Sequence, residues 1–192
     1  MIGQFLRTVR QHRQMDPLHV TMTGVRMGER FLQIGCDDRS LLGGLAAKVG
    51  LSGGCAVVAF DEASAERARS VGAKVGALID VRVVVPGVLG VDPASVDMVV
   101  VDDTRGTFAR MRDADRSAVL VEARRALREG GRIDVVERVA VTGLLGGHIT
   151  RPDGYTVEAD LAAAGFKPVR MLAEKAGVRF VEGLRSAGAS ES

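Results

Sequence analysis

Two patterns alternate along the chain from residue 30 onward, and this alternation restricts the fold more than any other feature. Short apolar runs, some of them rich in β-branched residues as at 96–101, are each followed by a stretch with helical periodicity. Such an order is typical of βαβ units, in which helices connect and cover parallel strands. The last two runs, 167–174 and 178–183, are separated only by "KAG", which is too short for a helical crossover. We therefore expect a mainly parallel sheet that closes with an antiparallel hairpin.

The same patterns give a full set of expected elements. Strands are expected at 30–34, 53–60, within 77–85, 96–101, 132–137, 167–174 and 178–183. Helices are expected at 40–49, 63–71, 113–128 and 156–164. The glycine pair of "EGG" at 129–131 should end the third of these helices, because glycine often lies just past a helix end.

The first 29 residues differ in character from the rest. Their apolar positions 2, 5, 6 and 9 fall on one side of a short predicted helix, and arginines fall on another. We expect an N-terminal helical extension or lid over residues 1–29, a main domain over 30–185 and a flexible tail over 186–192. The extension either packs on the domain with its charges in solvent or binds a membrane surface or a partner.

Composition argues against several classes of protein. A length of 192 residues with 46% hydrophobic content is enough for one domain with a sizeable core. The net charge is only +2 and the arginines lie mostly on presumed helix faces, so no nucleic-acid partner is expected. No apolar run reaches the roughly 18 residues of a transmembrane segment. Cys36 and Cys55 belong to no CxxC or Cys/His spacing, so we predict no metal site and expect a reduced, cytoplasmic protein.

Five segments resemble the motifs of class I S-adenosylmethionine-dependent methyltransferases. They are "RFLQIGC", "VVAFDEASAERAR", "VDPASVDMVVVDD", "VEARRALREGGRIDVVE" and "LAAAGFKPVRM", which follow the family's order across about residues 28–183. The resemblance implies an α/β fold: a doubly wound, Rossmann-like, seven-stranded and mostly parallel sheet with an antiparallel last strand. A dinucleotide-binding Rossmann domain is the competing assignment. It is disfavoured because G-x-G-x-x-G is absent and because the "AGF" turn and closing hairpin belong to the methyltransferase arrangement.

The resemblance implies S-adenosylmethionine as the cofactor, bound at the carboxyl ends of the strands, where ligands of open parallel sheets bind. Asp61, or Glu62 beside it, follows the second strand. A carboxylate there can accept hydrogen bonds from both ribose hydroxyls. Capping of the following helix is an alternative role for Asp61, and the two roles are compatible.

The turn after the first strand departs from the family pattern of an acid and three alternating glycines. Only Gly35 keeps its place, while Gln33 stands at the acid position and Asp37 and Arg39 stand at glycine positions. The Asp37 side chain occupies volume that a cofactor needs, with strain of about 1 kcal/mol or more if the turn demands a positive φ. Alternatively, Asp37 and Asp38 meet the cationic amino group of the methionyl end and replace the missing acid.

Three further residues complete the predicted cofactor contacts: Cys36 in this turn, Pro86 after the third strand and Asp102 after the fourth. The family often has an acid after the third strand that binds the adenine amino group. Here adenine would meet backbone groups and apolar side chains of 85–88 instead. Cys36 is either a reactive thiol at a helix N-terminus or a small buried side chain.

Methyl transfer needs few catalytic residues, because the sulfonium is already activated and the protein mainly aligns a nucleophile. Asp102 and the neighbouring Asp103 lie near the expected substrate position, and His148 and Tyr155 lie in a loop that could cover it. We predict Asp102, His148 and Tyr155 as the base or positioning groups. For each, the alternative is a cap, a loop hydrogen bond or an exposed polar residue.

The favoured function is an S-adenosylmethionine-dependent methyltransferase acting on a small molecule. The altered turn at 35–39 supports an alternative, a catalytically inactive protein of the same fold that serves as a binding or scaffold subunit. A different nucleotide ligand is a third hypothesis. A second copy of the chain is a predicted partner, because the closing hairpin exposes a sheet edge.

Overall fold

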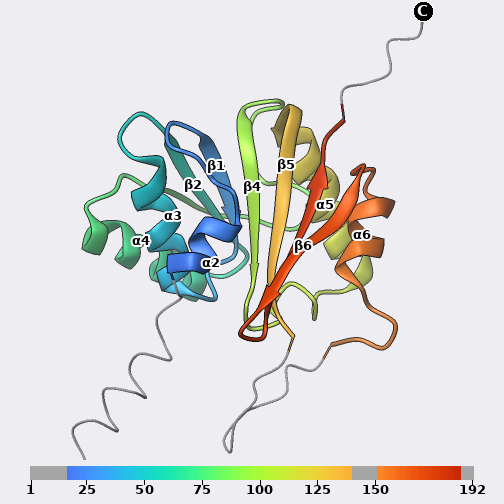
Figure 1. Ribbon diagram of the computed structural model, residues 1–192. Coiled ribbons are helices and arrows are strands. Elements are labelled where there is room, and N and C mark those ends of the chain that lie inside the picture. Colours follow the sequence, from blue (N-terminus) through green and yellow to red (C-terminus); the bar gives the residue numbers. More distant parts are fainter. Residues whose placement is uncertain (1–16, 140–150, 187–192) are drawn as a thin grey trace, which may run out of the picture.

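The computed structural model describes residues 17–139 and 151–186, and in this part of the chain seven strands form one sheet (Figure 1). The strands are β1 (Arg30–Ile34), β2 (Gly54–Ala59), β3 (Asp80–Val83), β4 (Val96–Asp103), β5 (Leu127–Arg138), β6 (Val169–Lys175) and β7 (Val178–Leu184). The helices are α2 (Pro17–Met22), α3 (Arg39–Val49), α4 (Glu62–Val75), α5 (Asp113–Ala126) and α6 (Val157–Ala163).

The strand order is β3-β2-β1-β4-β5-β7-β6. Strands β1 to β5 pair in parallel, whereas β7 pairs antiparallel with both β5 and β6. The predicted fold class is therefore confirmed, including the closing hairpin. After β1 the chain builds outward to β3 and then returns to the other side of β1, so the β1–β4 boundary is the switch point where a ligand site is expected.

Helices cover both faces of the sheet, and each face has its own buried core. On one face α2, α3 and α4 pack on side chains such as Phe31, Met98 and Phe180. On the other face α5 and α6 pack on side chains such as Ile133 and Phe166. The connection 84–95 between β3 and β4 contains no helix, and its buried Leu89 joins the α5 side.

The predicted boundary between the third helix and the fifth strand is wrong. Helix α5 ends at Ala126 rather than at 128, and β5 begins at once with Leu127, which pairs with Val96. The ladder then shifts register before Met98 pairs with Arg132. Gly130 takes a φ of +68°, so the glycine pair forms an irregularity within the strand and does not cap the helix.

The predicted N-terminal helix over residues 2–9 lies outside the described residues, but α2 is described and packs on α3. The contact is close because Gly44 of α3 has no side chain: a Cβ added there would come within 2.5 Å of a Val20 methyl group. The division into extension, domain and tail stays a prediction. Across 17–139 and 151–186, none of the helices has both the length and the apolar character of a membrane span.

One charged residue lies inside the core of the α2–α4 face. Asp134 of β5 is fully buried, and neither of its carboxylate oxygens has a hydrogen-bond partner within the described part of the chain. Burial raises the pKa of Asp134 well above its usual range, and the neighbouring Glu182 carboxylate adds to the rise. The folded protein therefore favours the neutral acid.

We predict that Asp134→Asn stabilises the protein at neutral pH. The folded-state pKa of Asp134 is higher than its unfolded-state pKa of about 3.9, so this residue favours folding most below about pH 3.9, where its carboxyl is protonated in both states. That contribution to the free energy of unfolding is lost as the pH rises. The advantage of the variant should therefore grow between pH 5 and pH 8. Thermal unfolding at several pH values measures it, with about 2–4 °C in Tm expected for each kcal/mol gained.

The exposed Asp153 provides the control, since Asp153→Asn should leave Tm unchanged over the same pH range. An Asp134→Asn variant that is less stable than the wild type at pH 8 would show that the ionised carboxylate has a partner and would contradict the account.

Candidate functional site

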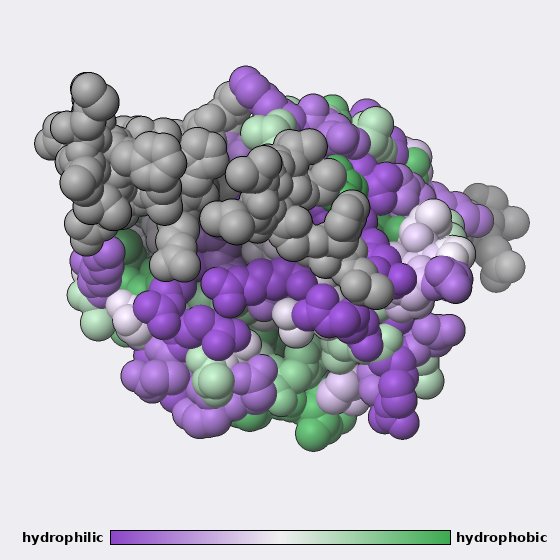
Figure 2. Space-filling model, turned by 90° about the horizontal axis from the view of Figure 1, so that it is seen from below, coloured by the Kyte–Doolittle hydropathy of each residue, from purple (hydrophilic) through white to green (hydrophobic). Residues whose placement is uncertain are grey.

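A small pocket opens at the carboxyl edge of the sheet, beside the switch point. Seven residues line it: Ile34, Gly35, Phe60, Asp102, Thr107, Phe108 and Met111. Its empty volume is about 230 Å³, which includes space open to solvent, so the enclosed part is small. Seen from this edge, hydrophilic side chains run across the middle of the described surface and hydrophobic ones gather below them (Figure 2).

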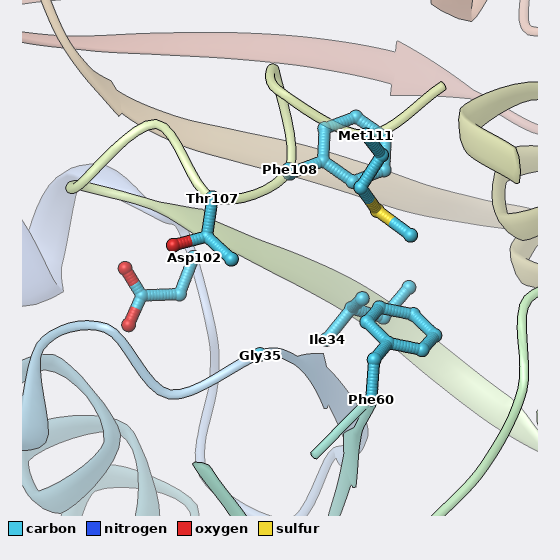
Figure 3. A pocket seen from close by; sticks show the side chains of 7 residues that line it. All are labelled: Ile34, Gly35, Phe60, Asp102, Thr107, Phe108 and Met111. Carbon is cyan, nitrogen blue, oxygen red and sulfur yellow. The ribbon is translucent and has the colours of Figure 1, made fainter. Parts of the chain in front are cut away.

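The pocket has an apolar side and a polar side (Figure 3). Phe60 and the sulfur of Met111 face one another across the gap, and Ile34 lies behind Phe60. The Asp102 carboxylate and the Thr107 hydroxyl lie on the opposite side, away from these apolar groups. The apolar side suits a flat ring or a methyl group, whereas the polar side already contains hydrogen-bonding partners.

Gly35 forms the tight turn that ends β1. Its φ is +79°, its N–H donates to the Val58 carbonyl at 2.9 Å, and an added Cβ would lie 3.4 Å from the Asp102 carbonyl. The positive φ favours glycine, and the added Cβ would be in ordinary van der Waals contact with the carbonyl. Gln33, at the acid position of the family motif, is buried and donates from Nε2 to the Gly35 carbonyl at 3.0 Å, so it supports the turn from inside.

Asp37 does not present a free carboxylate to the pocket. One oxygen accepts from the Thr107 hydroxyl at 2.9 Å and the other from the backbone N–H of Arg105 at 3.3 Å. The side chain is 5% exposed. Neither Asp37 nor Arg39 has a positive φ, so the predicted backbone strain does not arise. The role of Asp37 in this structure is to join the turn after β1 to the loop after β4.

Asp102 makes a second bridge between the same two segments. Its carboxylate accepts from the backbone N–H of Asp38 at 2.7 Å and from the Thr104 hydroxyl at 2.7 Å and N–H at 3.2 Å. Burial raises the pKa of Asp102 to about 7, against the lowering effect of the hydrogen bond from Asp38. With three donors on one buried carboxylate, Asp102 is placed to hold the turns together.

The acids that start the two following helices act as caps. Asp38 accepts from the N–H groups of Ser40 and Leu41 at the start of α3, and Asp61 accepts from the Ser64 N–H at 2.7 Å at the start of α4. The capping role of Asp61 is thus confirmed, and its exposed side chain lies next to Phe60 at the pocket. Glu62 is exposed and pairs with Arg69 on the outside of α4.

Two other predicted cofactor contacts, Cys36 and Pro86, do not line the pocket. Cys36 is fully buried, and burial, followed in size by the effect of the Asp102 charge, raises the pKa of its thiol to about 12. The structure therefore favours the small buried side chain over the reactive thiol as the interpretation of Cys36. Pro86 lies in a turn after β3, between the exposed Val85 and Val88.

Of the other predicted catalytic residues, His148 lies outside the described residues. Tyr155 is described and does not line the pocket, and it lies close to Asp103 and Glu137. The Arg116 guanidinium stacks 4.7 Å from the centre of its ring. Burial, and then the charges of Asp103 and Glu137, raise the pKa of Tyr155, so its phenol stays protonated and cannot act as a base near neutral pH.

The pocket residues that the sequence interpretation missed are Ile34, Phe60, Thr107, Phe108 and Met111. Ile34 and Phe60 directly precede Gly35 and Asp61 and could have been included from their places at strand ends. The other three lie in the loop 104–112, where no periodic pattern marks a side chain as facing inward.

Comparison with known proteins supports this architecture. No family model matches the chain, and neither does any curated protein. Among solved structures, a SAM-dependent methyltransferase from Aquifex aeolicus superimposes with a TM-score of 0.71 at 18% identity, over 90% of this chain and 91% of that one. The chain has the class I methyltransferase fold.

Two further neighbours with this fold are longer proteins. A SAM-dependent O-methyltransferase from Thermotoga maritima matches with a TM-score of 0.62 at 16% identity, over 93% of this chain and 69% of its own. A 16S rRNA methyltransferase from Thermus thermophilus, in complex with AdoMet and guanosine, matches with a TM-score of 0.54 at 18% identity, over 90% of this chain and 39% of its own.

We predict that Asp102→Ala destabilises the protein by about 2–3 kcal/mol, because it removes the acceptor of hydrogen bonds from buried and half-buried donors. Urea denaturation measures the loss. Glu62→Ala removes an exposed carboxylate with one ion pair and should cost less than about 1 kcal/mol. Equal losses for the two variants would contradict the bridging role of Asp102.

Proposed function

We propose that the protein is an S-adenosylmethionine-dependent methyltransferase that acts on a small molecule. The observation that carries the proposal is the pocket beside Gly35, which lies at the β1–β4 switch point of a class I methyltransferase fold. Its apolar side, with Ile34, Phe60 and Met111, fits the adenosyl part of such a cofactor. When bound, the cofactor supplies an activated methyl group, and the residues of the chain hold the cofactor and the substrate in position.

The residues of the chain divide the binding task between them. Asp61 directly follows the pocket residue Phe60 and can accept hydrogen bonds from ribose hydroxyls while still capping α4. The methionyl end would have to enter between the turn after β1 and the loop after β4. Since Asp37 and Thr107 join these segments, binding at this end requires that their hydrogen bond opens.

The bridge through Asp37 also favours a second candidate function, a catalytically inactive scaffold of the same fold. In that case the two segments stay joined and no cofactor enters. Cofactor binding therefore separates the two candidates.

A small substrate is preferred over RNA. Nucleic-acid binding draws on many contacts between basic side chains and phosphates, and the whole chain has a net charge of only +2. The match to the rRNA enzyme covers only 39% of that protein. We also propose that the protein works in the cytoplasm, in keeping with its free Cys36 and Cys55, and that a second copy of the chain is a partner.

We predict that S-adenosylhomocysteine raises the Tm of the protein. A hundredfold excess over the dissociation constant adds about 2.7 kcal/mol, or several degrees for a chain of this size. Asp61→Ala should weaken binding by about 1–3 kcal/mol through loss of charge-assisted hydrogen bonds. No shift for the wild type at millimolar ligand would support the scaffold instead.

A matched control separates binding from stability. Thr156 caps α6 through its hydroxyl, far from the pocket in sequence, and Thr156→Ala should cost about 1 kcal/mol of stability, as loss of the Asp61 cap does. Thr156→Ala should nevertheless bind S-adenosylhomocysteine like the wild type. Equal affinity in Asp61→Ala and Thr156→Ala would remove Asp61 from the proposed site.

A further inference from the structure

Two carboxylates lie side by side under the carboxyl edge, on the α5–α6 side of the sheet. Asp103 ends β4 and Glu137 lies near the end of β5, and the two are direct partners in the parallel ladder. Both side chains are fully buried. Removing two ionised carboxylates from water costs several kcal/mol unless cations and hydrogen bonds compensate them. The groups that contact Asp103 and Glu137 therefore indicate which class of ligand can bind between them.

Only one of the two carboxylate oxygens of Asp103 accepts hydrogen bonds within the described residues. Its Oδ1 accepts from the backbone N–H groups of Phe108 at 2.8 Å and Ala109 at 3.1 Å. Its Oδ2 is buried and has no hydrogen-bond partner among the residues that the structure describes. The nearest cation, Nη2 of Arg151, lies 3.9 Å away, beyond hydrogen-bond distance.

Glu137 is paired on both sides. One oxygen binds the guanidinium of Arg179, which is held within strand β7. The other oxygen lies 2.7 Å from Nη2 of Arg151 in an ion pair but accepts no hydrogen bond of good geometry within the described residues. Arg151 precedes α6 and also donates to the Arg138 carbonyl. Nε of Arg151 is buried without an acceptor in the described part of the chain. Arg151 thus compensates the charge of Glu137. Within the described residues, however, its Nε–H has no acceptor and the Oδ2 of Asp103 has no donor.

Tyr155 adds a further polar atom to the same place. Its hydroxyl is buried and has no partner within 17–139 and 151–186. The cluster adjoins the pocket, because the backbone of Phe108 binds Asp103 while the side chain of Phe108 lines the pocket. Buried acceptor atoms without donors, next to a ligand pocket, indicate a site for a cation whose N–H groups reach them better than Arg151 does.

We propose that Asp103 and Glu137 form the subsite for the methyl acceptor, and that the acceptor is an organic cation with N–H donors, of the guanidinium or amine class. In the absence of the acceptor, the guanidinium of Arg151 occupies this subsite. The assignment to the acceptor rests on the proposed methyl transfer, whereas cation binding by the two carboxylates does not.

The charge balance of the cluster favours a cation over other ligand classes. With Arg151 displaced, Asp103 and Glu137 face the single positive charge of Arg179, which also lies 3.7 Å from Glu158. A neutral acceptor would require that Asp103, whose pKa is raised to about 6 by burial, takes up a proton, and an anionic acceptor would add a further negative charge. A cation with several N–H donors restores the balance and also reaches the unused oxygen of Asp103.

Chemical rescue tests the subsite without relying on activity. Arg151→Ala should lower Tm by several degrees, since it leaves a buried carboxylate unpaired. Millimolar ethylguanidinium should restore most of that loss, whereas ethylurea, which has a similar shape and no charge, should not. The exposed Arg112, which pairs with Asp115, gives the control: Arg112→Ala should show no rescue. Rescue by ethylurea, or no rescue, overturns the proposal.

A second variant keeps the test decisive if Arg151→Ala does not fold. If Arg151→Ala does not fold alone, refolding is attempted with ethylguanidinium, and then with Arg151→Gln. Failure of both variants to fold with the cation present overturns the proposal, because the cation then does not replace the side chain.

Coupling to the cofactor site tests the assignment to the acceptor. The dissociation constant of ethylguanidinium for Arg151→Ala should change at least about fivefold when S-adenosylhomocysteine saturates the protein. Rescue without such coupling, in a protein that binds S-adenosylhomocysteine, leaves a structural cation site and overturns the acceptor assignment. Rescue in a protein that does not bind S-adenosylhomocysteine contradicts the proposed function and leaves only the cation site.

Discussion

Hydrogen bonds from two carboxylates hold the turn after β1 against the loop after β4, and the shape of the candidate site depends on them. Asp37 reaches Thr107 and the Arg105 backbone, and Asp102 reaches back to the Asp38 backbone. They close the polar side of the cleft and leave the apolar side as a small pocket. The same bonds that stabilise the edge of the sheet therefore control how much room a ligand has.

The paired acids at the end of β4 serve two different places, because successive side chains of a strand point to opposite faces. Asp102 lies on the side of the α3 turn, where it joins backbone segments. Asp103 lies on the side of α5 and α6, next to Glu137 and Arg151. One short stretch of sequence thus contributes to both the proposed cofactor cleft and the proposed acceptor subsite, which is consistent with two ligands meeting at this edge.

Sequence reasoning was strongest where a pattern repeats along the chain. The strand 30–34, the cap at Asp61 and the closing hairpin all follow from periodicity and capping chemistry, and all are present. It was weaker where a residue's role depends on a partner distant in sequence. Asp37 was expected to meet a cofactor, but its partner Thr107 is 70 residues away. Glu137 lies near the end of β5, much as Asp103 ends β4 and Asp61 follows β2, and this position was the signal in the sequence for the acid pair.

The central claim is that the Asp37 bridge closes a cleft that otherwise takes the cofactor. Isothermal titration of S-adenosylhomocysteine into Asp37→Gly tests it most directly, with Thr107→Val as the variant that breaks the same bond from the other side. The account predicts that both variants bind about tenfold more tightly than the wild type, since one hydrogen bond to a charged group no longer has to open. Weaker binding by Asp37→Gly would contradict it, because the carboxylate would then hold the ligand itself.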